Sequence, residues 1–268
     1  MLGKLIKYEF KLTSKTIFTT WAVLAAATLM GSLALLRLDQ GDSSDATFSV
    51  IMSGVMLILY IIALIGIYCV DFIYLCYHYH KTMYSSQGYL THTLPVSPAA
   101  TLGVKIFTLF VWMTVSSVLL SASVLILLQV GSGGEFFNAF SWKEFTLSVD
   151  EIFGMSVSYL IFLAVVEFLL GLLYRILWIT ASMAIGQLFQ SGRTGFSILA
   201  GFCIYLANQI VSTIFLAATG YNLNALLEGS VRSFINYVMG GSIGIGIAFI
   251  VLLYGICFYI NKKKLNLE

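Results

Sequence analysis

Long apolar stretches alternate with short polar segments along the whole chain. Each stretch holds about 20 residues, the length that a helix needs to cross the roughly 30 Å hydrocarbon core of a bilayer. A backbone in lipid must satisfy its own hydrogen bonds, so these stretches predict helices rather than strands. We therefore expect an all-α, polytopic membrane protein with one transmembrane domain over residues 1–268. The six expected spans cover about residues 16–36, 47–70, 105–130, 165–188, 196–219 and 237–260.

The composition of the chain excludes a water-soluble domain. Hydrophobic residues make up 59% of the chain and charged residues 10%, whereas soluble proteins carry about 25% charged residues. All four cysteines lie inside or at the ends of apolar stretches, which predicts small buried side chains rather than disulfides. These cysteines are Cys69, Cys76, Cys203 and Cys257.

The first 15 residues combine a basic stripe with an apolar face. An interfacial amphipathic helix over residues 1–15 would place its lysines near anionic headgroups, and a plain basic flank of the first span is the alternative. The run from Ile17 to Leu36 exceeds the 7–15-residue apolar core of a signal peptide, which favours a retained span. The residues of the expected interfacial helix that we single out are Lys4, Lys7, Glu9, Phe10 and Lys11.

Two charged residues interrupt the fourth apolar stretch. Phe153 to Leu188 would form about 54 Å of helix, so we expect part of it to project as an outer amphipathic extension before the span. Glu167 and Arg175 lie about 80° apart around a helix and two turns distant, too far for a strong direct bond. Structural anchoring and a transport path are both open for this pair. Asp71, near the end of the second span, is expected to be exposed at the membrane interface.

The distribution of Lys and Arg predicts the orientation of the chain. With the N-terminus inside, ten of these residues lie on the cytoplasmic side and three lie outside. An excess of Lys and Arg marks cytoplasmic loops. Eight of the twelve acidic residues fall in the expected outer loops, which agrees with this orientation. We therefore expect both termini to be cytoplasmic.

The polar segment over residues 78–104 separates the second and third spans. It holds both prolines of the chain and no acidic residue. Ser97 and Pro98 predict a helix start, with serine as the N-cap and proline at the first helical position. Its length and aromatic content favour a docking element for a soluble partner over an ordinary reverse turn. Its histidines do not predict a metal site, because no cysteine or acid joins them. They are His78, His80 and His92.

Catalytic and nucleotide-binding motifs are missing from the sequence. There is no Walker A pattern (G-x-x-x-x-G-K-[ST]), so we expect this chain to be no enzyme and to bind no cofactor. The lysines flank spans rather than forming a patch for nucleic acid. The glycine-rich run at residues 240–246 predicts close helix packing through Gly240-x-x-x-Gly244.

Two stretches resemble the ABC-2 type permease family, the membrane subunits of type V ABC exporters. They are KYEFK at residues 7–11 and GYLTHTLPVSPAATLGVK at residues 88–105. The second stretch is similar to the G-Y-L-x-x-T-L-P-V-S…K signature of small Gram-positive members. The resemblance covers the whole chain in topology and these two stretches in motif.

The resemblance implies a multi-pass permease subunit in a bacterial plasma membrane. It implies two partner chains: a second permease, in a homodimer or heterodimer, and a cytoplasmic ATPase that binds ATP and Mg²⁺. Residues 78–104 would be the cytoplasmic coupling loop that fits a groove on that ATPase. The expected contacts are Tyr84, Gln87, Gly88, Tyr89, Leu90, His92 and Leu94.

The cargo that the resemblance implies is hydrophobic or amphipathic, such as an antimicrobial or toxin peptide. Small members of the family are associated with export of such peptides or immunity to them. Two other functions stay open: a non-transporting immunity or sensor subunit, and an ion-coupled secondary transporter. The second of these usually shows inverted repeats, and the sequence has no convincing repeat.

Overall fold

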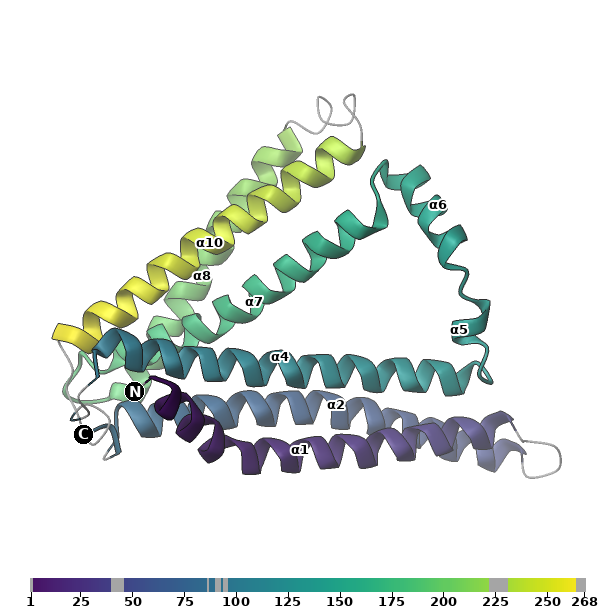
Figure 1. Cartoon of the computed structure of the whole chain (residues 1–268), viewed down its shortest axis with the longest axis horizontal. Helices are drawn as coiled ribbons and strands as arrows, with labels where there is room; N and C mark the ends of the chain where they lie inside the picture. The colour runs from purple at the N-terminus through teal and green to yellow at the C-terminus, as the bar shows by residue number, and fades with distance from the viewer. Residues whose placement is uncertain are drawn as a thin grey trace. The chain divides into compact units, whose positions relative to one another are not determined.

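Six long helices dominate the structure, a computed structural model that describes residues 2–39, 46–85, 87–89, 93, 96–221 and 231–263. Each of the six is long and apolar enough to cross a membrane (Figure 1). The prediction of an all-α, polytopic transmembrane protein is thereby confirmed. The long helices are α1 (Leu2–Asp39), α2 (Ala46–Met83), α4 (Pro98–Gly131), α7 (Val157–Gly186), α8 (Arg193–Tyr221) and α10 (Val231–Lys263). Two shorter helices, α5 (Phe136–Ala139) and α6 (Trp142–Phe153), lie between α4 and α7 in the sequence.

The long helices extend beyond the apolar stretches that predict them. α2 runs for 38 residues and ends at Met83, well past the expected end of the second span. α4 begins at Pro98, as the Ser97-Pro98 pair predicts, and the Ala100 N–H donates to Ser97 Oγ at 3.3 Å. Hydropathy marks the part of a helix that lipid surrounds, whereas capping and side-chain packing decide where the helix ends.

The fourth apolar stretch is not one continuous helix, contrary to the expectation for Phe153 to Leu188. α6 ends at Phe153, and Gly154 adopts a φ of 64°, a left-handed conformation that glycine allows without strain. Ser156 is extended, and α7 starts at Val157. The segment between the third expected span and this stretch therefore contains α6, none of whose residues is buried. A positive φ stops a helix where hydropathy alone shows no boundary.

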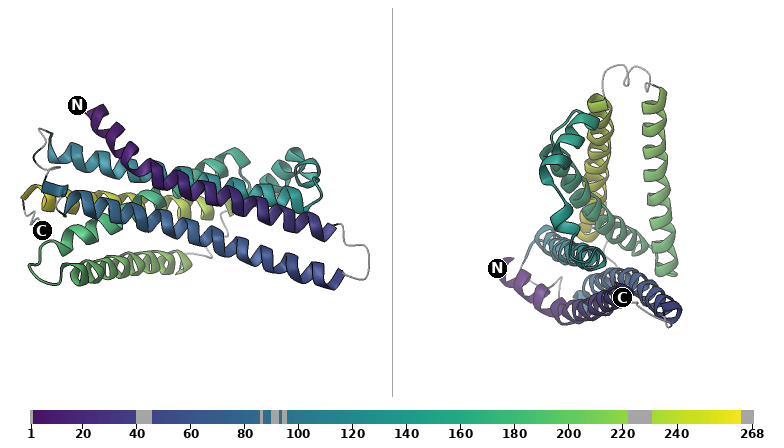
Figure 2. Two further views of the ribbon diagram at one scale, coloured as in Figure 1. Left: turned by 90° about the horizontal axis from the view of Figure 1, so that it is seen from below. Right: turned by 90° about the vertical axis from the view of Figure 1, so that its right-hand side faces the viewer.

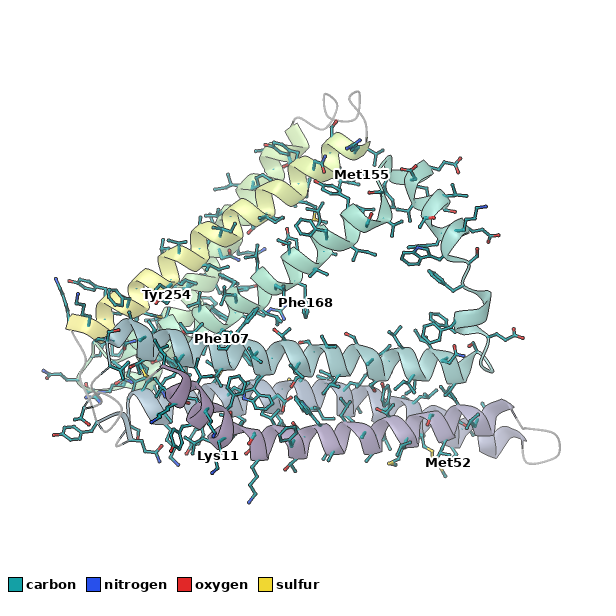
Figure 3. All side chains as sticks on the ribbon, in the orientation of Figure 1. Lys11, Met52, Phe107, Met155, Phe168 and Tyr254 are labelled. Carbon is teal, nitrogen blue, oxygen red and sulfur yellow. The ribbon has the colours of Figure 1, made fainter. Side chains whose placement is uncertain are left out.

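Compact unit A contains most of α1, α2 and α4, which run side by side (Figure 1 and Figure 2). It consists of residues 6–77 and 111–141. Polar side chains join its helices: Trp112 Nε1 donates to Thr13 Oγ1 at 2.8 Å, and the Tyr60 and Ser123 hydroxyls lie 2.6 Å apart. Apolar side chains gain little by leaving lipid for a neighbouring helix, so such polar contacts contribute to specific packing. Outward residues such as Met52 are apolar and exposed, as suits contact with lipid (Figure 3).

Asp71 is completely buried inside unit A, which corrects the expectation of interfacial exposure. Thr20 on α1 donates to Asp71 Oδ1 at 2.6 Å, and Ser116 on α4 donates to Oδ2 at 2.7 Å. Ser116 Oγ also accepts from Trp21 Nε1 at 3.0 Å. Both carboxylate oxygens are thus paired with hydroxyls from neighbouring helices, which compensates for the loss of water around a buried charge.

Compact unit B contains α6, α7, α8 and α10, with the end of α2 and the start of α4. It consists of residues 1–5, 78–110 and 142–268. α7 packs against both α8 and α10, and Trp178 Nε1 on α7 donates to the Gly201 carbonyl on α8 at 2.8 Å. α1, α2 and α4 all contribute residues to both units, so no single position in the chain separates the units. The single permease domain stays a prediction.

Close packing of α8 on α10 depends on Gly241 rather than on Gly240 and Gly244. A Cβ at Gly241 would collide with the Phe215 ring. Gly240 and Gly244 are exposed, and a Cβ at either position would meet nothing within 4 Å. The prediction of a Gly240-x-x-x-Gly244 contact is wrong within this chain, because the spacing does not reveal which helix face meets α8.

Candidate functional site

The first candidate site is the connector between α2 and α4, residues 84–97. The sequence predicts a loop over residues 78–104, but α2 continues to Met83 and α4 starts at Pro98. Tyr79 and Met83 are almost completely buried, so the last turns of α2 are packed within unit B and stay helical. The connector is therefore about half as long as the loop expected from the sequence.

Buried polar contacts hold both ends of the connector. The Tyr84 hydroxyl donates to Asn261 Oδ1 on α10 at 3.2 Å, and its ring packs edge-on against Tyr79 with centroids 5.9 Å apart. Burial raises the pKa of the Tyr84 phenol, which keeps it a neutral hydrogen-bond donor. On the other side, Lys105 on α4 is 3% exposed, and its Nζ donates to Thr82 Oγ1 at 2.8 Å. Tyr84 thus ties the connector to α10, and the Lys105–Thr82 bond joins α4 to α2 beside it.

The expected partner contacts fall into three groups. Gln87 and Tyr89 are exposed, with Tyr89 at 65%. Tyr84 and Gly88 are buried, so the expectation that Tyr84 contacts a partner is wrong in this structure: its side chain faces α10 and anchors the connector. Leu90, His92 and Leu94 lie outside the described residues.

The expected interfacial helix is the first part of α1, which runs from Leu2 to Asp39 with no break at residue 15. Lys4, Lys7 and Lys11 are exposed, and Figure 3 shows Lys11 directed away from the helix. Phe10 packs against Trp112 with ring centroids 5.4 Å apart, and Glu9 is buried. The lysines can reach headgroups, whereas Phe10 packs against Trp112 on α4.

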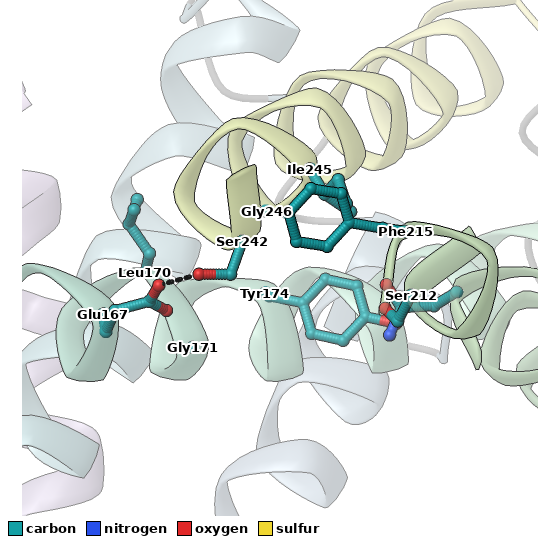
Figure 4. A pocket seen from close by; sticks show the side chains of 10 residues that line it. Glu167, Leu170, Gly171, Tyr174, Ser212, Phe215, Ser242, Ile245 and Gly246 are labelled. Atoms are coloured by element: carbon teal, nitrogen blue, oxygen red, sulfur yellow. Dashed lines mark hydrogen bonds between the residues drawn. The ribbon is translucent and has the colours of Figure 1, made fainter. Parts of the chain in front are cut away.

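The second candidate site is a cavity of about 220 Å³ between α7, α8 and α10. Figure 4 shows Glu167 on α7 facing Ser242 on α10, whose hydroxyl donates to Glu167 Oε1. Tyr174 on α7 and Phe215 on α8 place aromatic rings in the same cavity. Arg175 is exposed and does not line it. The structure therefore separates the two intramembrane charges and gives Glu167 a partner on another helix.

The neutral polar residues of this cavity were not identified from the sequence. Asn208 and Ser212 come from one face of α8, four residues apart, and Ser242 comes from α10. Two polar residues four positions apart inside an apolar stretch can indicate a polar site in the membrane, because both side chains then lie on the same face of the helix. Whether these side chains lie beside Glu167 depends on how each of the three helices is rotated about its own axis. Residue spacing within one helix does not reveal that rotation.

The described residues of the two candidate sites form no metal centre. Among the described residues, no group of three or more His, Cys, Asp or Glu side chains could hold a metal ion. The cysteines of this part of the chain are free thiols, and Cys69 and Cys203 are exposed rather than buried as expected. Lipid-facing positions accept cysteine because it behaves as a small hydrophobic side chain.

Comparisons with known proteins give no relatives for this chain: no family model, no curated protein and no solved structure matches it.

Proposed function

We propose that this protein is the membrane-spanning permease subunit of an ATP-binding-cassette exporter, driven by a separate cytoplasmic ATPase. ATP and Mg²⁺ would bind to that partner, and a second permease chain would complete the transporter. The cargo would be a hydrophobic or amphipathic molecule such as a peptide. The resemblance of residues 7–11 and 88–105 to the ABC-2 permeases motivates this proposal, together with the six potential spans.

The observation that carries the proposal is that the connector exposes Tyr89 while Tyr84 anchors it to α10. A coupling element must offer side chains to a soluble motor and must also be attached firmly to the helices that move. Tyr89 meets the first requirement, since it is 65% exposed. Tyr84 meets the second, since its buried hydrogen bond ties the connector to α10, and the Lys105–Thr82 bond joins the two helices that flank the connector. An exposed contact residue and an anchored connector are together what a coupling element requires.

The test is the effect of Tyr89→Ala on the ATPase that co-purifies with the full chain. Removing an aromatic anchor at an interface commonly costs about 2 kcal/mol, or more than tenfold in affinity. We expect Tyr89→Ala to lower the recovered ATPase, and its stimulation by the permease, by about tenfold or more. Mg·ATP hydrolysis in reconstituted vesicles is the measurement.

Tyr259→Ala is the matched control for this experiment. Tyr259 is also an exposed tyrosine, 51% accessible, but lies near the end of α10 outside the connector. We expect this variant to keep the ATPase and its stimulation. Normal assembly and turnover in Tyr89→Ala would exclude the connector as the docking element.

The second candidate function is an ion-coupled transporter, which the position of Glu167 in a membrane-spanning helix favours. Ionisable groups inside spans often belong to ion or proton pathways. Transport by the purified chain in vesicles without any ATPase, dependent on an ion gradient, would support this function and contradict the exporter.

A further inference from the structure

We propose that the cavity between α7, α8 and α10 binds the cationic headgroup of an amphipathic cargo, with Glu167 as the counter-charge. The word cargo rests on the proposed function, because only an exporter moves the ligand. Binding of the ligand to the cavity requires no partner chain. The chemical class is a primary ammonium group on an apolar body, as a basic amphipathic peptide or a long-chain amine carries.

Charge is the first reason for this assignment. Glu167 is half-buried, and its described hydrogen bond comes from the Ser242 hydroxyl. A serine hydroxyl is a neutral donor and leaves the negative charge of a carboxylate in place. A charge in a low-dielectric site is costly unless an opposite charge accompanies it. The site therefore favours a cation that arrives with the ligand.

The neutral lining suits an ammonium group in particular. An ammonium group has three N–H donors and no acceptor, and the cavity offers oxygen acceptors on Asn208, Ser212 and Tyr174 besides Glu167. In the described part of the chain, the buried Tyr174 hydroxyl has no hydrogen-bond partner. The rings of Tyr174 and Phe215 add faces that attract cations. Carboxylate, neutral acceptors and aromatic faces thus complement one cationic headgroup.

The size and depth of the cavity indicate how the ligand sits. Its volume of about 220 Å³ is below the roughly 300–1,000 Å³ of pockets that enclose a whole drug-sized ligand. Glu167 lies about 7 Å from the midpoint of α7 at 1.5 Å per residue, and Asn208 lies next to the midpoint of α8. α8 is largely exposed along its length. The headgroup therefore enters the cavity near the middle of the spans, and the apolar body stays among lipid tails.

The experiment measures binding of two fluorescent probes to the full chain in phosphatidylcholine nanodiscs. The probes share one dye and one twelve-carbon chain and differ only at the end, which is a primary ammonium in one and a hydroxyl in the other. Signals from empty nanodiscs are subtracted to remove partitioning into lipid. We expect the wild type to bind the ammonium probe about tenfold more tightly, the ratio that one charge-assisted hydrogen bond supplies.

Three variants separate charge from structure. Glu167→Gln keeps the shape of the side chain and should abolish the preference, so that the two probes bind with about equal affinity. Ser242→Ala removes the described hydrogen bond but keeps the charge, so the preference should persist. Glu151→Gln removes an exposed acid on α6, outside the cavity, and should change nothing. Elution as a monodisperse species with unchanged helical circular dichroism shows that each variant is folded.

Two outcomes would overturn the inference: equal binding of both probes to the wild type, or an undiminished ammonium preference in Glu167→Gln. Neither outcome would touch the exporter proposal, because the assay contains no ATPase. Conversely, a failed docking test at Tyr89 would leave a positive binding result intact.

Discussion

Single polar side chains hold neighbouring helices in register in both units. In unit A the Asp71 carboxylate accepts from Thr20 on α1 and Ser116 on α4, so one residue joins three helices. In unit B the buried Lys105 ammonium donates to Thr82. The sequence shows these charged residues, but it suggests an interfacial position for Asp71 and does not indicate that Lys105 is buried. Their burial becomes visible only when hydroxyl partners from other helices lie beside them.

Thr20→Val tests the contribution of the hydroxyls around Asp71. The substitution keeps the shape of the side chain but removes the donor to Oδ1, leaving a buried charged group with one partner fewer. We expect the free energy of unfolding to fall by about 1–3 kcal/mol, measured by circular dichroism during unfolding of the purified chain in mixed micelles with increasing SDS.

Thr19→Val is the control for this measurement. Thr19 is exposed, and its hydroxyl donates to the Lys15 carbonyl of its own helix at 2.8 Å. We expect a change within about 0.5 kcal/mol, as at other exposed positions. Equal losses in the two variants would show that the bond to Asp71 contributes nothing specific.

Helix packing in unit B depends on which face of α10 meets α8. Gly241 faces the Phe215 ring, and that ring also stacks on Tyr237 with centroids 5.8 Å apart. The glycine-rich run was a correct signal that α10 approaches another helix closely. It could not identify the contacting glycine, because Gly240, Gly241 and Gly244 all lie within little more than one turn.

Gly241→Ala should destabilise the contact between α8 and α10. The added methyl group collides with the Phe215 ring, which has to move, and such overpacking commonly costs about 1–3 kcal/mol. We expect a lower melting temperature of the purified chain in detergent. The measurement is the amount of monodisperse protein that remains after heating.

Gly244→Ala is the matched comparison on the same helix. Its Cβ meets nothing within 4 Å, and alanine favours a helix over glycine by about 1 kcal/mol. We expect an unchanged or slightly raised melting temperature. If Gly244→Ala were the more harmful substitution, α10 would be rotated relative to the packing described above.

At the scale of the whole molecule, the number of spans and their order follow from hydropathy. In the part of the chain that the structure describes, six helices are long and apolar enough to cross a membrane, and each contains most or all of the stretch that predicted it. The orientation stays a prediction from the distribution of Lys and Arg. It places the connector in the cytoplasm and the segment between α4 and α7 outside the cell.

Cysteine labelling with a membrane-impermeant maleimide tests this orientation. Tyr89 and Glu135 are both exposed positions on opposite sides of the predicted membrane. We expect Tyr89→Cys to react only after the cells are permeabilised, and Glu135→Cys to react in intact cells. The unmodified chain is the control, because its four cysteines all lie in the long helices. Labelling of Tyr89→Cys in intact cells would contradict both the orientation and the exporter proposal.

The sequence by itself determined the α-helical, multi-pass architecture, because an apolar stretch of about 20 residues has few alternatives to a transmembrane helix. It also marked Ser97-Pro98 as a helix start and Glu167 as an intramembrane charge, since both depend on local chemistry. Only the tertiary structure showed the burial of Asp71, the anchoring role of Tyr84, the contact at Gly241 and the polar lining around Glu167. Each of these depends on the rotation of one helix against another, and side chains distant in sequence set that rotation.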